Sequence, residues 1–161
     1  MCRQKCSSDL VPLTFKAAFI ALVMLRTVAE LRAEPKADRI VVHKKSRMME
    51  LMHAGQVLKT YRIALGGNPV GPKMRQGDHR TTEGEYVIDN RNSGSQFHRS
   101  LHISYPNAED KLRARKLGGH TGGDIFIHGL PNGYGFVGAA HRTRDWTDGC
   151  IAVTDQEIEE I

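Results

Sequence analysis

Two short stretches near the end of the chain say most about its fold and its chemistry: residues 127–129, Ile-His-Gly, and residues 145–151, Asp-Trp-Thr-Asp-Gly-Cys-Ile. Residues 124–128 predict a β-strand whose two isoleucines share one face and whose phenylalanine and histidine share the other. His128 then lies where a strand runs out into a loop, which is a common position for catalytic groups. The glycine-rich residues 130–140 predict a loop that can bend back over that position.

Cys150 and His128 are the pair that could carry nucleophilic chemistry. Gly149 lets the backbone next to Cys150 approach a substrate closely. A free thiol is mostly protonated at neutral pH, and a neighbouring imidazole is the usual base. The sequence leaves open whether the proton moves during attack or the pair rests as imidazolium and thiolate, and an activated thiol predicts alkylation well below pH 8. The alternatives are a small buried cysteine and a structural histidine.

The His-Gly pair followed by Thr-Asp-Gly-Cys-Ile resembles the L,D-transpeptidase (YkuD-type) catalytic domains of bacterial cell walls, over roughly residues 39–161. The usual signature of that family has a histidine before Gly-Cys and an arginine two residues after the cysteine. Asp148 and Ala152 stand at these positions here. The run from Asp145 to Val153 is similar to one branch, the YafK-like proteins, which includes a hydrolase that releases a wall-anchored lipoprotein.

The resemblance implies acyl transfer through a thioester on Cys150, with His128 as proton donor and acceptor and the Gly129 carbonyl orienting its ring. The implied donor is a peptidoglycan stem peptide. Backbone N–H groups of Asp148, Gly149 and Cys150 would form the oxyanion hole. Arginines could clamp the substrate carboxylates, although each taken singly would equally suit a solvated surface charge. The candidate substrate contacts are Arg80, His102, Arg142, Arg144 and Trp146.

No cofactor or metal is expected. His98 and His102 lie four residues apart, and along a strand this separates their side chains by roughly 13 Å, too far for shared zinc ligation. The functional alternative for either one is a place in the cleft beside His128. Asp145 is expected to be a turn or cap residue, whereas Asp148 could stabilise an imidazolium. Trp146 would suit the core as well as a substrate platform.

Two rival functions remain open. An amidase or hydrolase on the same scaffold would cleave a link between peptidoglycan and protein, or a peptide bond, because the outcome depends on whether an amine or water reaches the thioester. The more distant rival is a non-enzymatic wall-binding module with an inert Cys150. Thiol reactivity separates the second rival from both enzymes.

Length and charge restrict the function classes. A chain of 161 residues with 40% hydrophobic residues is long enough for one domain with its own core. The net charge is +5, but residues 1–33 hold five basic and two acidic side chains, so the remainder carries only +2. This near balance of positive and negative charges argues against nucleic-acid binding, as does the lack of a motif that combines aromatic with basic residues.

Residues 1–33 predict a signal peptide or an N-terminal membrane anchor. Basic residues precede the apolar run 17–25, which is short for a membrane span, and small residues follow up to Ala33. Either version places the domain 34–161 in the periplasm or on the extracellular side of the inner membrane. Cleavage would remove Cys2 and Cys6, and Cys150 alone could then form no internal disulfide.

The rest of the chain predicts a mainly β, α+β domain of antiparallel sandwich-like architecture with short helices. Val57, Tyr61, Ile63 and Leu65 are expected on one face of their strand. The capping box at 154–157 opens a helix that the sequence carries only to Ile161, so we expect the domain to continue beyond it. The predicted strands are 39–44, 47–53, 57–65, 85–89 and 97–105, with a turn at 54–56, a long loop at 66–84 and a helix at 106–117.

Overall fold

The computed structural model describes residues 35–161, of which residues 36–161 form one compact unit. The predicted signal or anchor at 1–33 lies outside the described residues. Within 35–161, none of the helices has the length and apolar character that a membrane crossing requires.

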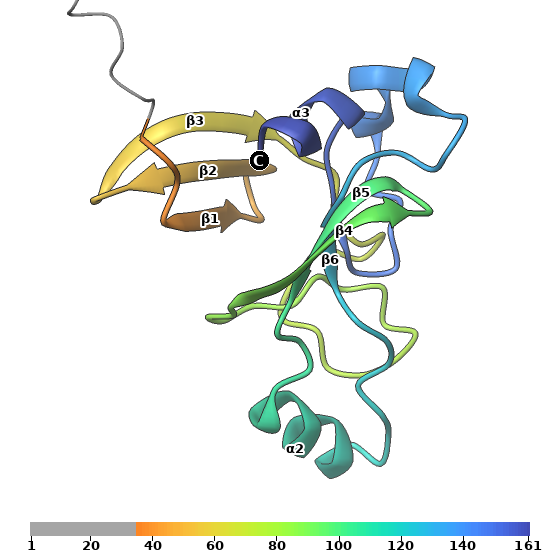
Figure 1. Cartoon of the computed structure of the whole chain (residues 1–161). Helices are drawn as coiled ribbons and strands as arrows, with labels where there is room; N and C mark the ends of the chain where they lie inside the picture. The colour runs from red at the N-terminus through yellow and green to blue at the C-terminus, as the bar shows by residue number, and fades with distance from the viewer. Residues whose placement is uncertain (1–34) are drawn as a thin grey trace, which may run out of the picture. The chain divides into compact units, whose positions relative to one another are not determined.

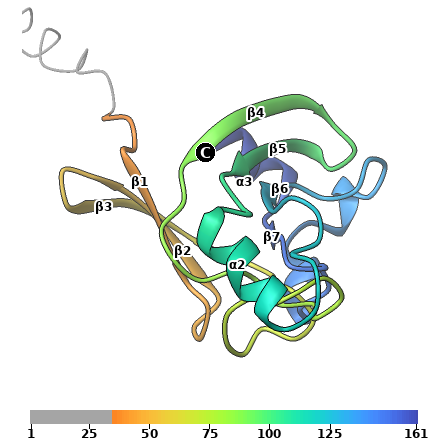
Figure 2. The ribbon, with the colours of Figure 1, turned by 90° about the horizontal axis from the view of Figure 1, so that it is seen from below.

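Two β-sheets make up the domain, in the strand orders β1-β2-β3 and β4-β5-β6-β7. All neighbouring strands are antiparallel except β6 and β7, which are parallel. Figures 1 and 2 both place β1–β3 to one side of the second sheet, and α2 lies below that sheet in Figure 1. The predicted mainly β architecture with short helices is confirmed. The elements are β1 (Arg39–His43), β2 (Met48–His53), β3 (Gln56–Arg62), β4 (Ile88–Ser95), β5 (His98–Ile103), α2 (Ala108–Lys116), β6 (Phe126–His128), the 3₁₀ segment η1 (Gly135–Thr143), β7 (Ile151–Ala152) and α3 (Asp155–Glu160).

The first sheet is the predicted meander, with one correction. Tyr61, Ile63 and Leu65 are buried as expected, but the Val57 residue is 50% exposed. The pairing of β2 with β3 shifts register between Leu51 and Met52. The additional residue of this bulge breaks the period of two, so Val57 turns to the solvent side.

Two further predictions differ from the structure. The strand expected at 85–89 begins at Ile88 and continues to Ser95 as β4, which pairs with β5. Its polar second half has no apolar alternation that would reveal a strand. The expected loop 130–140 is partly helical, because residues 135–143 form 3₁₀ turns that join across a kink at Gly138.

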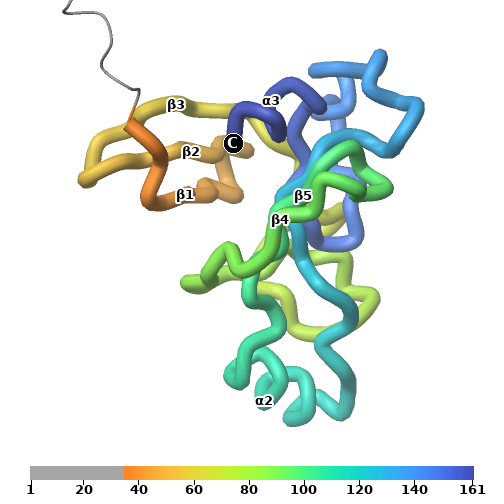
Figure 3. Tube along the Cα trace, viewed as in Figure 1, coloured from red at the N-terminus to blue at the C-terminus, as the bar shows by residue number. Residues whose placement is uncertain are grey.

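The long loop 66–84 runs next to the segment that follows α2, as the trace in Figure 3 shows. The Gln76 backbone N–H donates to the His120 carbonyl at 2.7 Å. Asp78 holds the loop from within, because its carboxylate accepts from three backbone N–H groups and from the buried Lys73 ammonium at 2.9 Å. Burial raises the pKa of Asp78, but these bonds together outweigh it and hold the pKa at about 2. The conformation of the loop is therefore held by the hydrogen bonds of the Asp78 carboxylate and not by an apolar core of its own.

Asp145 connects the first sheet to the segment that carries Cys150. Its carboxylate accepts from the Arg47 guanidinium at 2.7 and 2.9 Å and from the Leu65 backbone N–H at 2.9 Å. Only 16% of the Asp145 side chain is exposed. Asp145 therefore joins distant parts of the chain, and the turn or cap role expected from the sequence is wrong, because its acceptor bonds go to Arg47 and Leu65 and not to neighbouring backbone.

We predict that Asp145→Ala lowers the free energy of unfolding by about 2 kcal/mol, because it leaves a half-buried guanidinium and a backbone N–H without their acceptor. Urea denaturation followed by circular dichroism measures the change. Lys59→Gln, which breaks the exposed Lys59–Glu160 pair, is the control and should leave the unfolding midpoint close to wild type. Equal midpoints for Asp145→Ala and wild type would contradict the prediction.

Candidate active site

The parallel pairing of β6 with β7 determines where the two candidate residues lie. Ile127 is opposite Ile151 and His128 is opposite Ala152, and both isoleucines are buried in the core. His128 and Cys150 therefore share the other face. Cys150 immediately precedes β7, the strand next to His128, and is offset from His128 by two residues along the strand direction. This offset corresponds to about 8 Å between their Cα atoms, which is close enough for the two side chains to meet.

His128 is held in a buried, mostly apolar environment, with 3% of the residue exposed. Its Nδ1–H donates to the Gly129 carbonyl at 2.7 Å, which leaves Nε2 free to accept a proton. The rings of Phe97 and Trp146 contact the imidazole at centroid distances of 4.4 and 5.9 Å. Burial lowers the pKa of His128, and the Gly129 hydrogen bond opposes this only in part. The ring is therefore a neutral base at neutral pH.

Cys150 is a half-buried free thiol. Burial raises its pKa, a hydrogen bond with the Phe126 backbone opposes the shift, and the Asp148 carboxylate adds to it. Among the described residues, no hydrogen bond joins the thiol to His128. Both shifts favour a neutral thiol beside a neutral imidazole in the resting site, whereas the sequence predicted a thiol that is alkylated well below pH 8.

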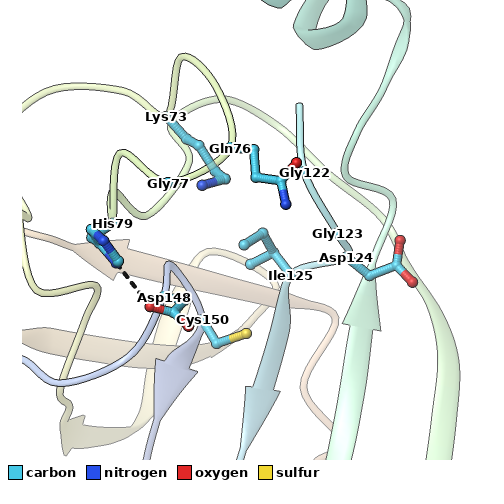
Figure 4. Close-up of a pocket in the computed structure, with 10 residues that line it drawn as sticks. All are labelled: Lys73, Gln76, Gly77, His79, Gly122, Gly123, Asp124, Ile125, Asp148 and Cys150. Carbon is cyan, nitrogen blue, oxygen red and sulfur yellow. Dashed lines mark hydrogen bonds and ion pairs between the residues drawn. The ribbon is translucent and has the colours of Figure 1, made fainter. Parts of the chain in front are cut away.

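Two cavities meet at Cys150, and Cys150 and Asp148 line both of them. The first, the histidine cavity, has a volume of about 440 Å³, and the second, the loop cavity, about 320 Å³. Figure 4 shows Lys73 and Gln76 pointing into the loop cavity above the thiol. The histidine cavity is lined by Asn92, Ser95, Gln96, Phe97, Ser100, Phe126, His128, Trp146 and Thr147; the loop cavity is lined by Lys73, Gln76, Gly77, His79, Gly122, Gly123, Asp124 and Ile125.

A glycine is required immediately before the cysteine. Gly149 has a φ of +132°, and a Cβ atom there would lie 2.6 Å from the Arg80 carbonyl and 3.1 Å from Ile125. Any side chain would push the Cys150 segment off the loop 66–84. The backbone N–H of Gly149 donates to Thr147 Oγ1 at 3.2 Å, so the candidate oxyanion donors in this segment are the backbone N–H groups of Asp148 and Cys150.

The model of the L,D-transpeptidase catalytic domain, YkuD, matches residues 37–161. The chain belongs to this family. Two proteins of Escherichia coli, strains K12 and O157:H7, both named "Putative L,D-transpeptidase YafK", are 31% identical to it over 130 residues. The match covers 76% of this chain and 44% of each relative, so the chain spans less than half of their length. A structure of Bd1075 from Bdellovibrio bacteriovorus has a TM-score of 0.48 and 24% identity, covering 78% of this chain and 45% of that one.

The two positions that depart from the usual family signature have distinct environments. The Asp148 side chain is 92% exposed, and its carboxylate accepts from His79 Nδ1 at 2.8 Å, as the dashed line in Figure 4 marks. Ala152 is fully buried and bridges Ala64. In this L,D-transpeptidase-family domain, Asp148 is therefore engaged with the loop 66–84 and is directed to the loop cavity.

The candidate substrate contacts are distributed unevenly around the site. Trp146 lines the histidine cavity, but the other four are not among the side chains that line either cavity. Arg142 is bonded to Glu157, Arg144 is exposed, and the Arg80 backbone carbonyl lies next to Gly149. His102 is on the same sheet face as Ser100, but it pairs with Asp89 and packs on the Phe126 ring at 5.1 Å.

The sequence did not identify His79, Lys73 or the β4–β5 residues that line the cavities. His98, the other histidine considered for the cleft, has a φ of +63° and bonds Glu159 at 2.7 Å. That turn-like conformation breaks the alternation of 97–105 and brings Phe97 onto His128. Among residues 35–161, no three His, Cys, Asp or Glu side chains are grouped as metal ligands.

The charges around Cys150 predict how its reactivity depends on pH. Because burial raises the thiol pKa, the rate of alkylation by iodoacetamide should keep rising past the ordinary thiol value of about 8.5. Asp148→Asn removes a negative charge and should lower the midpoint, whereas Lys73→Met removes a positive charge and should raise it. Rates measured from pH 6 to 10 test this, with Asp89→Asn as the control. A plateau already reached at pH 7 would contradict the neutral resting pair.

Proposed function

We propose that this domain is a cysteine-dependent L,D-transpeptidase that acts on peptidoglycan stem peptides, with Cys150 as nucleophile and His128 as general base and acid. One observation carries the proposal: the β6–β7 register directs both side chains to one face, where they line one cavity. The Gly129 carbonyl, bonded to Nδ1, fixes the tautomer in which Nε2 can accept the thiol proton. A non-enzymatic wall-binding module would need no such arrangement.

The reaction runs in two acyl-transfer steps. As the sulfur attacks a stem-peptide carbonyl, His128 Nε2 takes the thiol proton, and the backbone N–H groups of Asp148 and Cys150 stabilise the oxyanion. The C–N bond then breaks, the leaving amine takes the proton from the imidazolium, and a thioester remains on Cys150. An incoming amine attacks the thioester, transfers its proton to His128, and releases the thiol with a new amide bond.

The two cavities suit a reaction that needs two substrates. Each opens onto Cys150, so a donor peptide in one leaves the thioester approachable from the other. The histidine cavity, with its aromatic walls and hydrogen-bonding side chains from β4, resembles a peptide site. The loop cavity carries Lys73, His79 and Asp148 and is the more polar approach.

Hydrolysis on the same scaffold is the second candidate, and the environment of Asp148 favours it. The usual histidine and arginine beside the nucleophile are absent, and Asp148 adds a negative charge next to the thiol. A carboxylate-bearing amine acceptor would be held less well here, whereas water needs no cationic partner. The bond cleaved would then be one between a stem peptide and protein, a wall-anchored lipoprotein in the branch that the motif resembles.

We predict a larger hydrolytic share than in members that keep the usual histidine and arginine. Mass spectrometry of a muropeptide donor incubated with the domain, with and without an excess of a D-amino acid, measures the ratio of hydrolysis to exchange. Cys150→Ser, nearly matched in volume, should remove both products while the circular dichroism spectrum is unchanged. Cross-linking or exchange with little hydrolysis would show that the two substitutions have no such effect, and full activity of Cys150→Ser would overturn the mechanism.

We also propose that the protein is exported, on the basis of the basic and apolar pattern of residues 1–33. Protein recovered from its own cells should lack the residues before Glu34 or remain bound to the membrane by them. N-terminal sequencing of the fractionated protein is the measurement. An unprocessed chain in the cytosolic fraction would contradict export.

A further inference from the structure

One carboxylate outside both cavities is connected to His128 by a continuous chain of hydrogen bonds. Asp155 is the first residue of α3, and its Oδ1 accepts from the Leu130 backbone N–H at 2.8 Å. That N–H belongs to the same peptide group as the Gly129 carbonyl. The carbonyl accepts from His128 Nδ1 at 2.7 Å. One peptide plane therefore has a carboxylate at its N–H and the imidazole at its oxygen.

The surrounding backbone is shaped to admit this carboxylate. A Cβ atom on Gly129 would lie 2.7 Å from Asp155 Oδ1, and one on Gly135 would collide with Oδ2. Gly129 does not have a positive φ, so its backbone conformation alone does not require glycine. Both glycines are explained by the space that the Asp155 side chain occupies.

The position of Asp155 is fixed from its own helix as well. The reciprocal bonds between Thr154 and Glu157 form a capping box that sets the first turn of α3. Three quarters of the Asp155 side chain is shielded from solvent, and His98 Nδ1 approaches Oδ2 to 4.0 Å. A carboxylate held in this way is already oriented before any substrate binds.

We infer that Asp155 is a positioning residue for His128 and acts through the Gly129–Leu130 peptide group. The inference rests on the proposed role of His128 as the general base. A negative charge at the N–H side of an amide increases the negative charge on its oxygen, because hydrogen bonds in a chain polarise one another. The oxygen then holds the Nδ1–H tautomer more firmly and stabilises the imidazolium that forms during attack.

In a serine-type triad, one carboxylate bonds the imidazole directly and orients it. Here the Gly129 carbonyl bonds the imidazole, and the Asp155 carboxylate bonds the same peptide group on its other side. A direct carboxylate beside a buried imidazole would raise the histidine pKa more strongly. The intervening amide gives a weaker effect, which leaves His128 neutral at rest. The other titratable groups near His128 are Cys150 and Asp148 on the histidine cavity and His141 beyond Trp146.

The test compares Asp155→Ala, Asp155→Asn and the control Glu159→Gln, which removes the same charge from the same helix and whose ion pairs within residues 35–161 are with His98 and Arg99. In Asp155→Ala, we expect the pKa of His128, followed by NMR of its ring C–H protons, to fall. We also expect kcat/KM on the muropeptide donor to fall about tenfold, mostly in kcat, which is at the low end of the loss seen when the hydrogen-bond partner of a metal-binding histidine is removed. Asp155→Asn keeps an oxygen for the Leu130 N–H and should recover part of both losses. Glu159→Gln should leave both within twofold of wild type.

A folded Asp155→Ala protein with the wild-type His128 pKa and wild-type pH profile would overturn the inference, as would an equal shift in Glu159→Gln. If Asp155→Ala does not fold, Asp155→Asn is the test variant. An unchanged His128 pKa together with an unchanged kcat in Asp155→Asn would then overturn the inference. The NMR readout needs no substrate. If Cys150→Ser retains activity while Asp155→Ala shifts the His128 pKa, the proposed function fails and the coupling of Asp155 to His128 stands.

Discussion

The site depends on one very short pairing, that of β6 with the two-residue strand β7. On the β6 side the Val153 N–H donates to the His128 carbonyl at 3.0 Å, and on the other side Ala64 and Ala152 exchange two N–H···O bonds at 2.9 Å. Through Ala64, the chain leaving the first sheet is tied to the strand that follows the thiol. A slip of one residue would turn Cys150 toward the core and away from His128, because side chains alternate along a strand. The buried isoleucines on the core face oppose that slip.

Burial is the second constraint, and it acts on the two candidate residues in opposite directions. It lowers the pKa of the imidazole and raises that of the thiol, so both rest uncharged. A permanently ionised thiolate would react with many electrophiles. A thiol that loses its proton only when a carbonyl lies within reach reacts more selectively. In the proposed mechanism, the cavity walls thus favour activation of Cys150 by bound substrate over high resting reactivity.

The sequence predicted most of the fold, and it singled out the candidate pair that lines one cavity in the structure, because both leave local signals. Alternation located most of the strands, the capping box located α3, and the strand end at His128 with the Gly-Cys step located the pair. What it missed depends on tertiary contacts. The positive φ of His98, the bulge that exposes Val57 and the turns of η1 have no periodic signature. Likewise, no local pattern in the sequence predicts the bond between Arg142 and Glu157.

Asp155 illustrates the limit of local patterns more closely. In the sequence, it is simply the acidic residue inside a capping box, a common helix start. Its contact with the peptide after His128 spans 25 residues, and only the packing of α3 against the β6 end brings them together. The two glycines that admit its carboxylate are equally ambiguous in the sequence, where they suggest flexibility.

Trp146 has a consequence that is independent of the chemistry. It is the only tryptophan in the sequence, which also contains four tyrosines. Its indole forms part of the histidine cavity, contacts the His128 ring and donates to His141 at 3.3 Å. Emission excited at the red edge of the absorption band therefore originates from one chromophore at the wall of the site. The protein carries its own optical reporter for occupancy of that cavity, with no label required.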